Sequence, residues 1–577
     1  MLGRSGGLQP HRQCGRLSRS PLPAHCVAPA GTVAGRDRGA SQARYTAVQR
    51  AAAGRHGRRG RSRIRGEFRP VAQPADRGRD RRCMGGRSRG SSGPPRCGRG
   101  AIFDQGNQPA APLPGAGARR SLWLACRQGR DMMEQPHSAL PGRADVAAKV
   151  RFLTVADTIG RTLVRDAIWH EDRCNWLIWT KEPVGGAFSS VYRAAGVDFY
   201  QGVGGIALFL AQLVAFTGDR YQRETLGGAV RQVMARLREP MQDRIGLYSG
   251  MLGAAKAVIS SGEIADESEW IDFGLEQLET ISRSSPEPSQ IDLLSGCAGA
   301  IVALVEIAQR YGRQNLLQEA HRLAEFLLSR AQHARDTVSW PTNIGEGRNL
   351  LGLSHGTAGI ALALLELNAV SPDKRYLDAA RGALRYERQH FNALQNNWPD
   401  YRALHGAPHD ATSFPIAWCH GSTGIGLSRL RIRQLLPDDP QILPELDVAI
   451  ANAIRAINAP IHPLSTDFSL CHGVTGSGDF LLLVGMLFGR ADGVMAAERL
   501  GDAGIEAFDK PRLPWICGVP DAGQTSSLMI GTAGIGHFYL RLYDPVAVPS
   551  ILLPIGAKGS VDLSASKPDA PVRPSAN

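Results

Sequence analysis

Two short segments of the chain carry residues that could bind a metal ion. Cys419 and Cys471 are each followed by a histidine and a glycine, in AWCHGSTGIG and LCHGVTG. Together with His472 they would suit catalytic zinc, which takes three protein ligands and leaves a fourth position open. Thiolate ligands also favour zinc over magnesium or calcium. The alternative is that both cysteines are small buried residues that serve packing. Because both stand in the same sequence context, we favour the metal site and expect one zinc ion per chain.

A third histidine, His355, precedes a glycine in the same way, in LSHGTAGI. Histidine can gain or lose a proton near neutral pH, so it is suited to acid–base chemistry beside a metal site. Other cysteines and histidines have simpler explanations. We expect packing roles for Cys174, Cys297 and Cys517, a core position for His537, and an exposed loop for His405 and His409.

The elements that must bring these residues together are internal repeats. A Gly-x-x-Gly pair occurs seven times, and each pair precedes an apolar segment with helical periodicity. More polar, amphipathic stretches such as 223–238 and 316–333 lie between the pairs. The pairs begin at intervals of 48, 46, 60, 65, 52 and 58 residues, at Gly202, Gly250, Gly296, Gly356, Gly421, Gly473 and Gly531.

Seven such repeats predict an all-α fold, an α/α toroid of seven helical pairs in two layers. The inner helices would be nearly apolar and the outer helices amphipathic, and glycine suits the loops where helix ends crowd together. In a closed ring, equivalent positions of successive repeats face one another across the mouth. Cys419, Cys471 and His472 could therefore converge. An open solenoid without an active site is the alternative.

The first 130 residues differ from the rest of the chain in composition. They contain 27 arginines, no lysine and 5 acidic residues, whereas the remainder contains 40 basic and 48 acidic residues. The net charge of +14 therefore comes from residues 1–130, and it does not indicate nucleic-acid binding by the remainder. This segment is rich in Arg, Gly and Pro. We expect it to be disordered, or not a genuine coding frame, because a GC-rich gene translated in a wrong frame gives such a composition. A disordered tail is expected at 555–577.

Membrane and export signals are missing from the sequence. No run of about 18 apolar residues occurs, and the N-terminus lacks the charged and apolar regions of a signal peptide. A cytoplasmic location is the expectation that follows.

The order of SHGTAGI, AWCHGSTGIG and LCHGVTG resembles the lanthionine synthetase C-like (LanC-like) proteins, the cyclases of lanthipeptide biosynthesis. FYQGVGGIALFL, IDLLSGCAGAI and LMIGTAGIGHFYLRLYDP match the same pattern. The sequence is most similar to the C-terminal cyclase domain of the bifunctional class II (LanM-type) synthetases. The resemblance implies a LanC-like domain over 145–554, folded as an α/α toroid with zinc at one mouth.

The resemblance also implies roles for individual residues. His355 would be the acid/base residue, Asp292 matches an acidic position near the site, and His420 would face the substrate. Arg429 fits a basic position of the family, with a salt bridge inside the barrel as the alternative. The implied zinc ligands are Cys419, Cys471 and His472.

The implied reaction adds a peptide cysteine thiol to dehydroalanine or dehydrobutyrine and forms a (methyl)lanthionine ring. A free thiol has a pKa of about 8.5, and binding to zinc would deprotonate it at neutral pH. The α carbon must then be protonated, a step that suits His355 with help from Asp292 or His420. The expected partner is a dehydrated precursor peptide, with a separate dehydratase and an export transporter as further candidates. No nucleic-acid partner is expected.

The sequence departs from the LanM type in one respect, because the Arg-rich segment stands where the dehydratase domain would be. The chain could be a stand-alone cyclase, a LanC-like protein that holds zinc and a thiol without forming rings, or the remnant of a disrupted synthetase. A carbohydrate enzyme on the same fold would need paired carboxylates. The motif loops offer Asp292 alone.

Overall fold

The computed structural model describes residues 143–184, 187–239, 245–284, 288–342, 348–402 and 412–556. They belong to one compact unit, Gly129–Asn577. The predictions for residues 1–130, for the tail beyond residue 556 and for His405 and His409 lie outside the described residues.

Seven helices of the described chain form an inner layer, and each begins directly after the first glycine of a Gly-x-x-Gly pair. These glycines are the N-caps, as Gly202 is for the first inner helix and Gly473 for the sixth. The inner helices are buried over most of their length, which explains why they carry few charges. They are α4 (Val203–Thr217), α6 (Met251–Ala265), α8 (Cys297–Tyr311), α10 (Thr357–Val370), α12 (Ser422–Leu435), α14 (Val474–Phe488) and α16 (Thr532–Tyr543).

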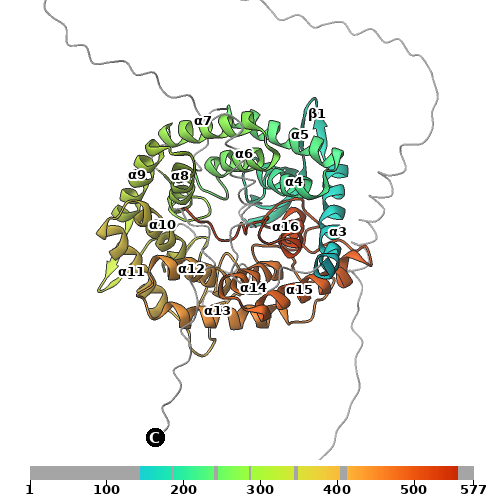
Figure 1. The fold of residues 1–577 in the computed structure, drawn as a ribbon. Helices are drawn as coiled ribbons and strands as arrows, with labels where there is room; N and C mark the ends of the chain where they lie inside the picture. The colour runs from blue at the N-terminus through green and yellow to red at the C-terminus, as the bar shows by residue number, and fades with distance from the viewer. Residues whose placement is uncertain are drawn as a thin grey trace, which may run out of the picture. The chain divides into compact units, whose positions relative to one another are not determined.

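Seven further helices cover the inner layer from outside (Figure 1). They are amphipathic, as α11 illustrates: Tyr376, Ala380 and Leu384 are buried, whereas Arg375 and Asp378 are exposed. A short π-helix, η1 (Ile505–Asp509), follows the last of them. The outer helices are α3 (Arg143–Asp166), α5 (Arg220–Leu237), α7 (Ser268–Ser284), α9 (Gln314–Arg330), α11 (Lys374–Gln389), α13 (Ile442–Ile457) and α15 (Ala491–Gly504).

The two layers close into a ring. Each inner helix packs against the next one in sequence, and α16 packs against α4, so the last repeat meets the first (Figure 1). α16 is covered by α3, the outer helix that precedes the first inner helix in the chain. The prediction of an α/α toroid of seven helical pairs is therefore confirmed, and the open solenoid is excluded.

The described residues contain three antiparallel β-hairpins that were not predicted from the sequence. They pair β1 (Ile168–His170) with β2 (Arg173–Asn175), β3 (Leu177–Val184) with β4 (Ala187–Ala194), and β5 (Gln332–Ala334) with β6 (Thr337–Ser339). In the longest hairpin Trp179 lies opposite Tyr192, with ring centroids 4.9 Å apart. Cross-strand aromatic pairs of this kind stabilise short strands. These hairpins extend the connections between helices and leave the toroid intact.

The second glycine of every pair is required by packing. A Cβ atom at Gly205, the first of these glycines, would lie 2.3 Å from the carbonyl oxygen of the residue six positions earlier. The same contact recurs in all seven repeats, at distances between 1.8 and 2.3 Å. Contacts this short are excluded for a real side chain. Each loop can therefore fold back against the first turn of its inner helix only if glycine stands there.

The segment that follows α16 crosses the interior of the ring (Figure 1). Its Ile551 carbonyl accepts a hydrogen bond from the Tyr248 hydroxyl at 2.8 Å, and its Leu552 carbonyl accepts one from the Trp418 indole at 2.9 Å. Val548 and Leu552 are fully buried. The segment thus links loops on different sides of the ring through its backbone.

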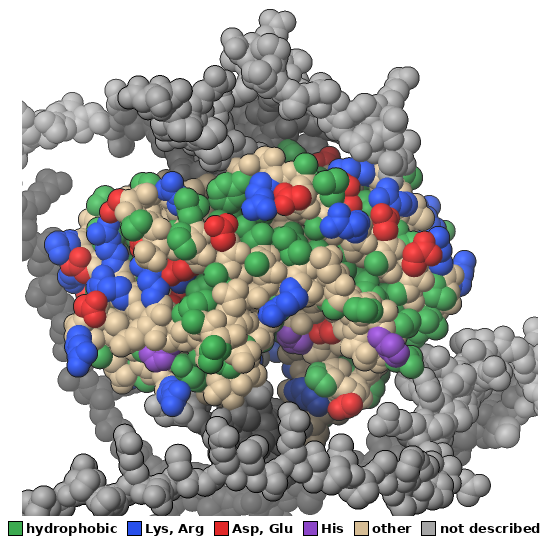
Figure 2. All heavy atoms as spheres, turned by 90° about the horizontal axis from the view of Figure 1, so that it is seen from below, with side chains coloured by type: hydrophobic (Ala, Val, Ile, Leu, Met, Phe, Trp, Pro, Cys, Tyr) green, Lys and Arg blue, Asp and Glu red, His purple; other side chains and the backbone are tan. Residues whose placement is uncertain are grey.

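The described surface is mixed in character. On the face shown in Figure 2, basic and acidic side chains are interspersed with apolar ones. None of the described helices is long and apolar enough to cross a membrane.

Candidate metal centre

The seven loops that open the inner helices are joined in a closed circle of backbone hydrogen bonds. The residue two positions before the first glycine of each repeat donates its N–H to the carbonyl of the equivalent residue in the next repeat. Met529 of the last repeat donates to Tyr200 of the first at 2.8 Å, which completes the circle. The seven residues, in order, are Tyr200, Tyr248, Leu294, Ser354, Cys419, Cys471 and Met529, with N–O distances between 2.8 and 3.4 Å.

This circle explains how residues far apart in sequence meet. Cys419 and Cys471 occupy neighbouring positions in it, and His355, His420 and His472 each follow a circle member directly. Equivalent positions of successive repeats therefore do lie side by side at the mouth.

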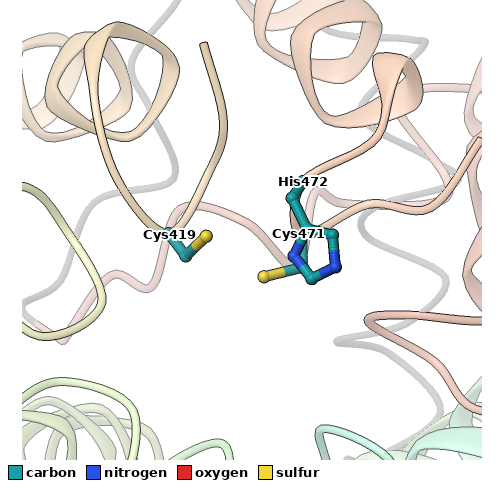
Figure 3. A group of neighbouring side chains, drawn as sticks. All are labelled: Cys419, Cys471 and His472. Carbon is teal, nitrogen blue, oxygen red and sulfur yellow. The ribbon is translucent and has the colours of Figure 1, made fainter. Parts of the chain in front are cut away.

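Cys419, Cys471 and His472 form a compact group (Figure 3). One ligand atom from each lies within 4.8 Å of the others. The side chains come from the neighbouring loops before α12 and α14 and point toward one another (Figure 3). Two thiols and an imidazole at this separation fit the three-ligand, open-position set of catalytic zinc.

The surroundings of His472 favour one ring nitrogen as the ligand. Its Nε2 donates to the Gly518 carbonyl at 2.7 Å, which leaves Nδ1 as the nitrogen that would bind a metal ion. Such a contact to a backbone carbonyl is what orients metal-binding histidines in proteins. Burial lowers the pKa of His472, but hydrogen bonding to Cys419 and the charge of that thiolate outweigh burial and raise the pKa to about 9.

The two thiols differ in acidity. Hydrogen bonding to Cys471 and His472 places the pKa of Cys419 well below its usual range, although burial opposes this. Burial and the neighbouring Cys419 place the pKa of Cys471 well above its usual range, and a hydrogen bond with Tyr200 partly offsets this. Cys419 is therefore the thiol of the pair that loses its proton first.

The loop that carries Cys419 is a tight turn. Gly421 closes it with a φ of 81°, and an added Cβ there would lie 1.7 Å from the Pro415 carbonyl oxygen. The Ala417 N–H donates to the His420 carbonyl at 3.2 Å within the same turn. The conformation that directs the Cys419 thiol toward Cys471 is therefore available only to glycine at position 421.

His355 and Asp292 form a second polar group at the mouth. The His355 Nδ1 lies 2.6 Å from Asp292 Oδ2, and the other carboxylate oxygen accepts the Ser295 N–H at 2.7 Å. Nδ1 donates to the carboxylate, and Nε2 has no hydrogen-bond partner among the described residues. The Asp292 side chain is 7% exposed and that of His355 18% exposed, so the pair is shielded but reachable.

His420 is buried between these two groups. Its ring stacks on that of His355, with centroids 5.6 Å apart, and neither ring nitrogen has a hydrogen-bond partner among the described residues. Burial lowers its pKa to about 4 against the opposing charge of Cys419. The nearest carboxylate is that of Asp400, 3.8 Å from Nδ1. His420 is therefore neutral at neutral pH.

Sequence reasoning did not single out Tyr200, Asp400 and Arg402. Tyr200 occupies the same position in its repeat as Cys419 and Cys471 do in theirs, so aligning the repeats would have found it. Asp400 and Arg402 lie outside the Gly-x-x-Gly loops and had no such signal.

Four residues for which the sequence predicted packing or core positions are buried. Cys174, Cys297 and Cys517 are buried and unpaired, away from the metal-ligand group. His537 is buried and bonds Gln212 Oε1 at 2.8 Å. Arg429 is fully buried and bonds Glu387 at 2.8 Å and Glu445 at 2.7 Å, which agrees with the salt-bridge interpretation.

Fold and site together define a helical toroid with a candidate three-ligand metal centre at its mouth. Residues 194–553 match the family described as lanthionine synthetase C-like protein, which is more than half of the chain. The chain belongs to this family, and the resemblance seen in the sequence is confirmed.

Individual relatives are distant. The lacticin 481/lactococcin biosynthesis protein LcnDR2 of Lactococcus lactis subsp. lactis is 22% identical over 363 residues, which cover 60% of this chain and 36% of that protein. The chain thus spans about a third of its length. Nisin cyclase shares 16% identity at a TM-score of 0.47, over 62% of this chain and 92% of that one. Cellobiose 2-epimerase from Spirochaeta thermophila shares 14% identity at a TM-score of 0.38, over 70% of this chain and 98% of that one.

Proposed function

We propose that the chain is a zinc-dependent lanthipeptide cyclase that closes (methyl)lanthionine rings on a dehydrated precursor peptide. The observation that carries the proposal is the convergence of Cys419, Cys471 and His472 within 4.8 Å. Membership of the lanthionine synthetase C-like family supports it, as does the similarity to a lacticin 481/lactococcin biosynthesis protein.

The three ligands would hold one Zn²⁺, with Nδ1 of His472 and both thiolates as donors. Zinc bound there would supply positive charge that keeps a substrate thiol deprotonated at neutral pH. The Tyr200 hydroxyl donates a hydrogen bond to the thiolate of Cys471. Gly518 and Tyr200 thus orient one imidazole and one sulfur of the ligand set.

His355 would deliver the proton that completes the addition. When the thiol adds to the β carbon of a dehydro residue, the α carbon gains electron density and must be protonated. The free Nε2 of His355 would take the proton that the substrate thiol loses and pass it to the α carbon, and the carboxylate of Asp292 holds the ring in place. We assign Asp292 as a positioning residue and His420 as an uncharged side chain that packs beside the reacting groups.

The substrate would be a precursor peptide that already carries dehydroalanine or dehydrobutyrine, so a dehydratase must act first. An export transporter would act on the product. A cytoplasmic location agrees with substrates made by the ribosome.

The proposal is tested by incubating the full chain with a dehydrated peptide that contains one cysteine. Ring closure leaves the peptide mass unchanged but removes its free thiol, so alkylation followed by mass spectrometry counts the rings formed. Zinc content of the same preparation is measured in parallel. Zinc retention with full alkylation of the peptide would identify a zinc- and thiol-binding protein without cyclase activity and refute the proposal. A folded chain without zinc would also refute it.

A further inference from the structure

Arg402 lies beside the candidate metal centre and has so far no part in the chemistry. Its Nε is 3.1 Å from both carboxylate oxygens of Asp400, and its Nη2 is 2.8 Å from Oδ2. The backbone N–H of Arg402 also donates to Asp400 Oδ1 at 3.0 Å. Asp400, itself almost fully buried, therefore fixes one edge of the guanidinium in a single orientation.

The other edge of the guanidinium is available. Nη1 has no hydrogen-bond partner among the described residues, and the Arg402 side chain is 36% exposed. Asp400, which holds the group, lies 3.8 Å from Nδ1 of His420, the residue that follows Cys419. Burial lowers the pKa of Arg402, but Asp400, followed by the charges of Cys419 and Cys471, raises it overall. A permanently charged donor is thus held at the mouth near both sulfurs.

The proposed reaction creates a negative charge that needs such a donor. As the sulfur of the substrate bonds to the β carbon, the electron pair of the Cα=Cβ bond moves toward the carbonyl of the dehydro residue, whose oxygen becomes an enolate. Protonation at the α carbon then returns the pair and restores the carbonyl. Every atom of the substrate is retained, and the proton lost from the thiol is balanced by the proton gained at carbon.

The acidic groups at the mouth, and His355 and His420, do not serve this oxygen. Asp292, Asp400 and Asp467 are acidic, and a carboxylate repels an enolate. His420 is buried with no nitrogen turned to solvent, and the Nε2 of His355 is needed at the α carbon.

We propose that Arg402 is a catalytic residue whose guanidinium donates to the enolate oxygen of the dehydro residue, with Asp400 as its positioning residue. This inference rests on the proposed cyclase function. Preorganised donors aimed at a developing oxyanion act chiefly on the transition state, so their loss lowers kcat more than it raises KM.

The test compares the full chain with Arg402→Gln, Arg402→Lys and Arg402→Ala in ring closure of a peptide with one cysteine and one dehydroalanine. Arg433→Gln is the matched control, because Arg433 bonds the Pro437 carbonyl near the C-terminal end of α12, away from the mouth. We expect Arg402→Gln to lower kcat by about 10²–10³-fold, as loss of one oxyanion donor does in other enzymes. Zinc content should stay unchanged, Arg402→Lys should keep part of the rate, and added guanidinium should partly restore Arg402→Ala.

Three results would each contradict one part of the proposal. Unchanged kcat in Arg402→Gln would overturn the role of Arg402 while leaving the cyclase function intact. Loss of zinc together with loss of rate, without rescue by guanidinium, would show that Arg402 only supports the cysteine loop and would also overturn the inference. A wild-type chain that forms no rings would refute the proposed function itself.

Discussion

The imidazole rings of His355 and His420 stack with their centroids 5.6 Å apart and their planes inclined by 26°. Their environments are nonetheless opposite. His355 is bonded to a carboxylate and partly open to solvent, whereas His420 is buried without a partner. Two histidines from successive repeats are thus given different chemistry by their neighbours.

Replacing His355 with Asn should abolish proton delivery and spare the metal. We expect ring closure to slow by about 10²–10⁴-fold, the usual contribution of a general acid, with zinc content unchanged. Thiol alkylation of the peptide measures the rate. His321→Asn is the control, because His321 lies on the outer helix α9 and bonds the Tyr376 hydroxyl of α11. A His355→Asn chain as fast as wild type would remove His355 from the mechanism.

Replacing Cys471 with Ala should release the metal. With one thiolate lost, we expect bound zinc to fall from about one ion per chain to nearly none, measured by elemental analysis of the purified protein. Cys517→Ala is the matched control, because Cys517 is also a buried free thiol but lies outside the ligand group. Equal zinc in both variants would exclude Cys471 as a ligand.

Replacing Gly421 with Ala should distort the cysteine loop. The positive φ costs about 1–3 kcal/mol for a non-glycine residue, and the contact with the Pro415 carbonyl adds to it. We expect lower unfolding free energy and weaker zinc binding. Gly218→Ala isolates the backbone cost, because Gly218 has a φ of 63° but open space around it. Its expected loss is about 1 kcal/mol, with zinc retained. The two losses are compared by denaturant unfolding.

Burial of His537 should make stability depend on pH. Burial lowers its pKa to about 3, against about 6.5 in the unfolded chain. The folded state therefore holds His537 neutral, and below pH 6.5 the unfolded state binds the extra proton. The contribution of His537 to the free energy of unfolding is therefore complete above pH 6.5. It falls as the pH drops toward 3, by about 2 kcal/mol at pH 5.

A His537→Gln variant checks this contribution. Gln does not titrate, so the unfolding free energy of the variant should fall less than that of wild type between pH 7 and pH 5. Parallel curves for the two proteins would contradict the assignment of His537 as a neutral buried histidine.

Much of the fold was predictable because the Gly-x-x-Gly signal is steric. A Cβ atom at Gly253 or Gly534 would lie 1.8 Å from a carbonyl oxygen, so glycine is required there and the pattern marks each inner helix. The hairpins had no comparable signal. β3 and β4 depend on local pairing such as Trp179 with Tyr192, which a short alternating segment does not reveal.

The candidate site was predictable to the same extent. Cys419, Cys471 and His472 stand at repeat-equivalent positions, and the sequence alone shows the equivalence. The link of Arg402 to the site was not predictable. It runs through Asp400 to His420, across a connection whose length differs from one repeat to the next.

The segment that follows α16 lies across the centre of the described toroid. Its Ile551 and Leu552 carbonyls are bonded to Tyr248 and Trp418, whose rings also contact each other with centroids 4.8 Å apart. In the proposed cyclase, a peptide at the mouth would therefore meet this packed centre. A precursor with several rings would then present its loops at the mouth one after another.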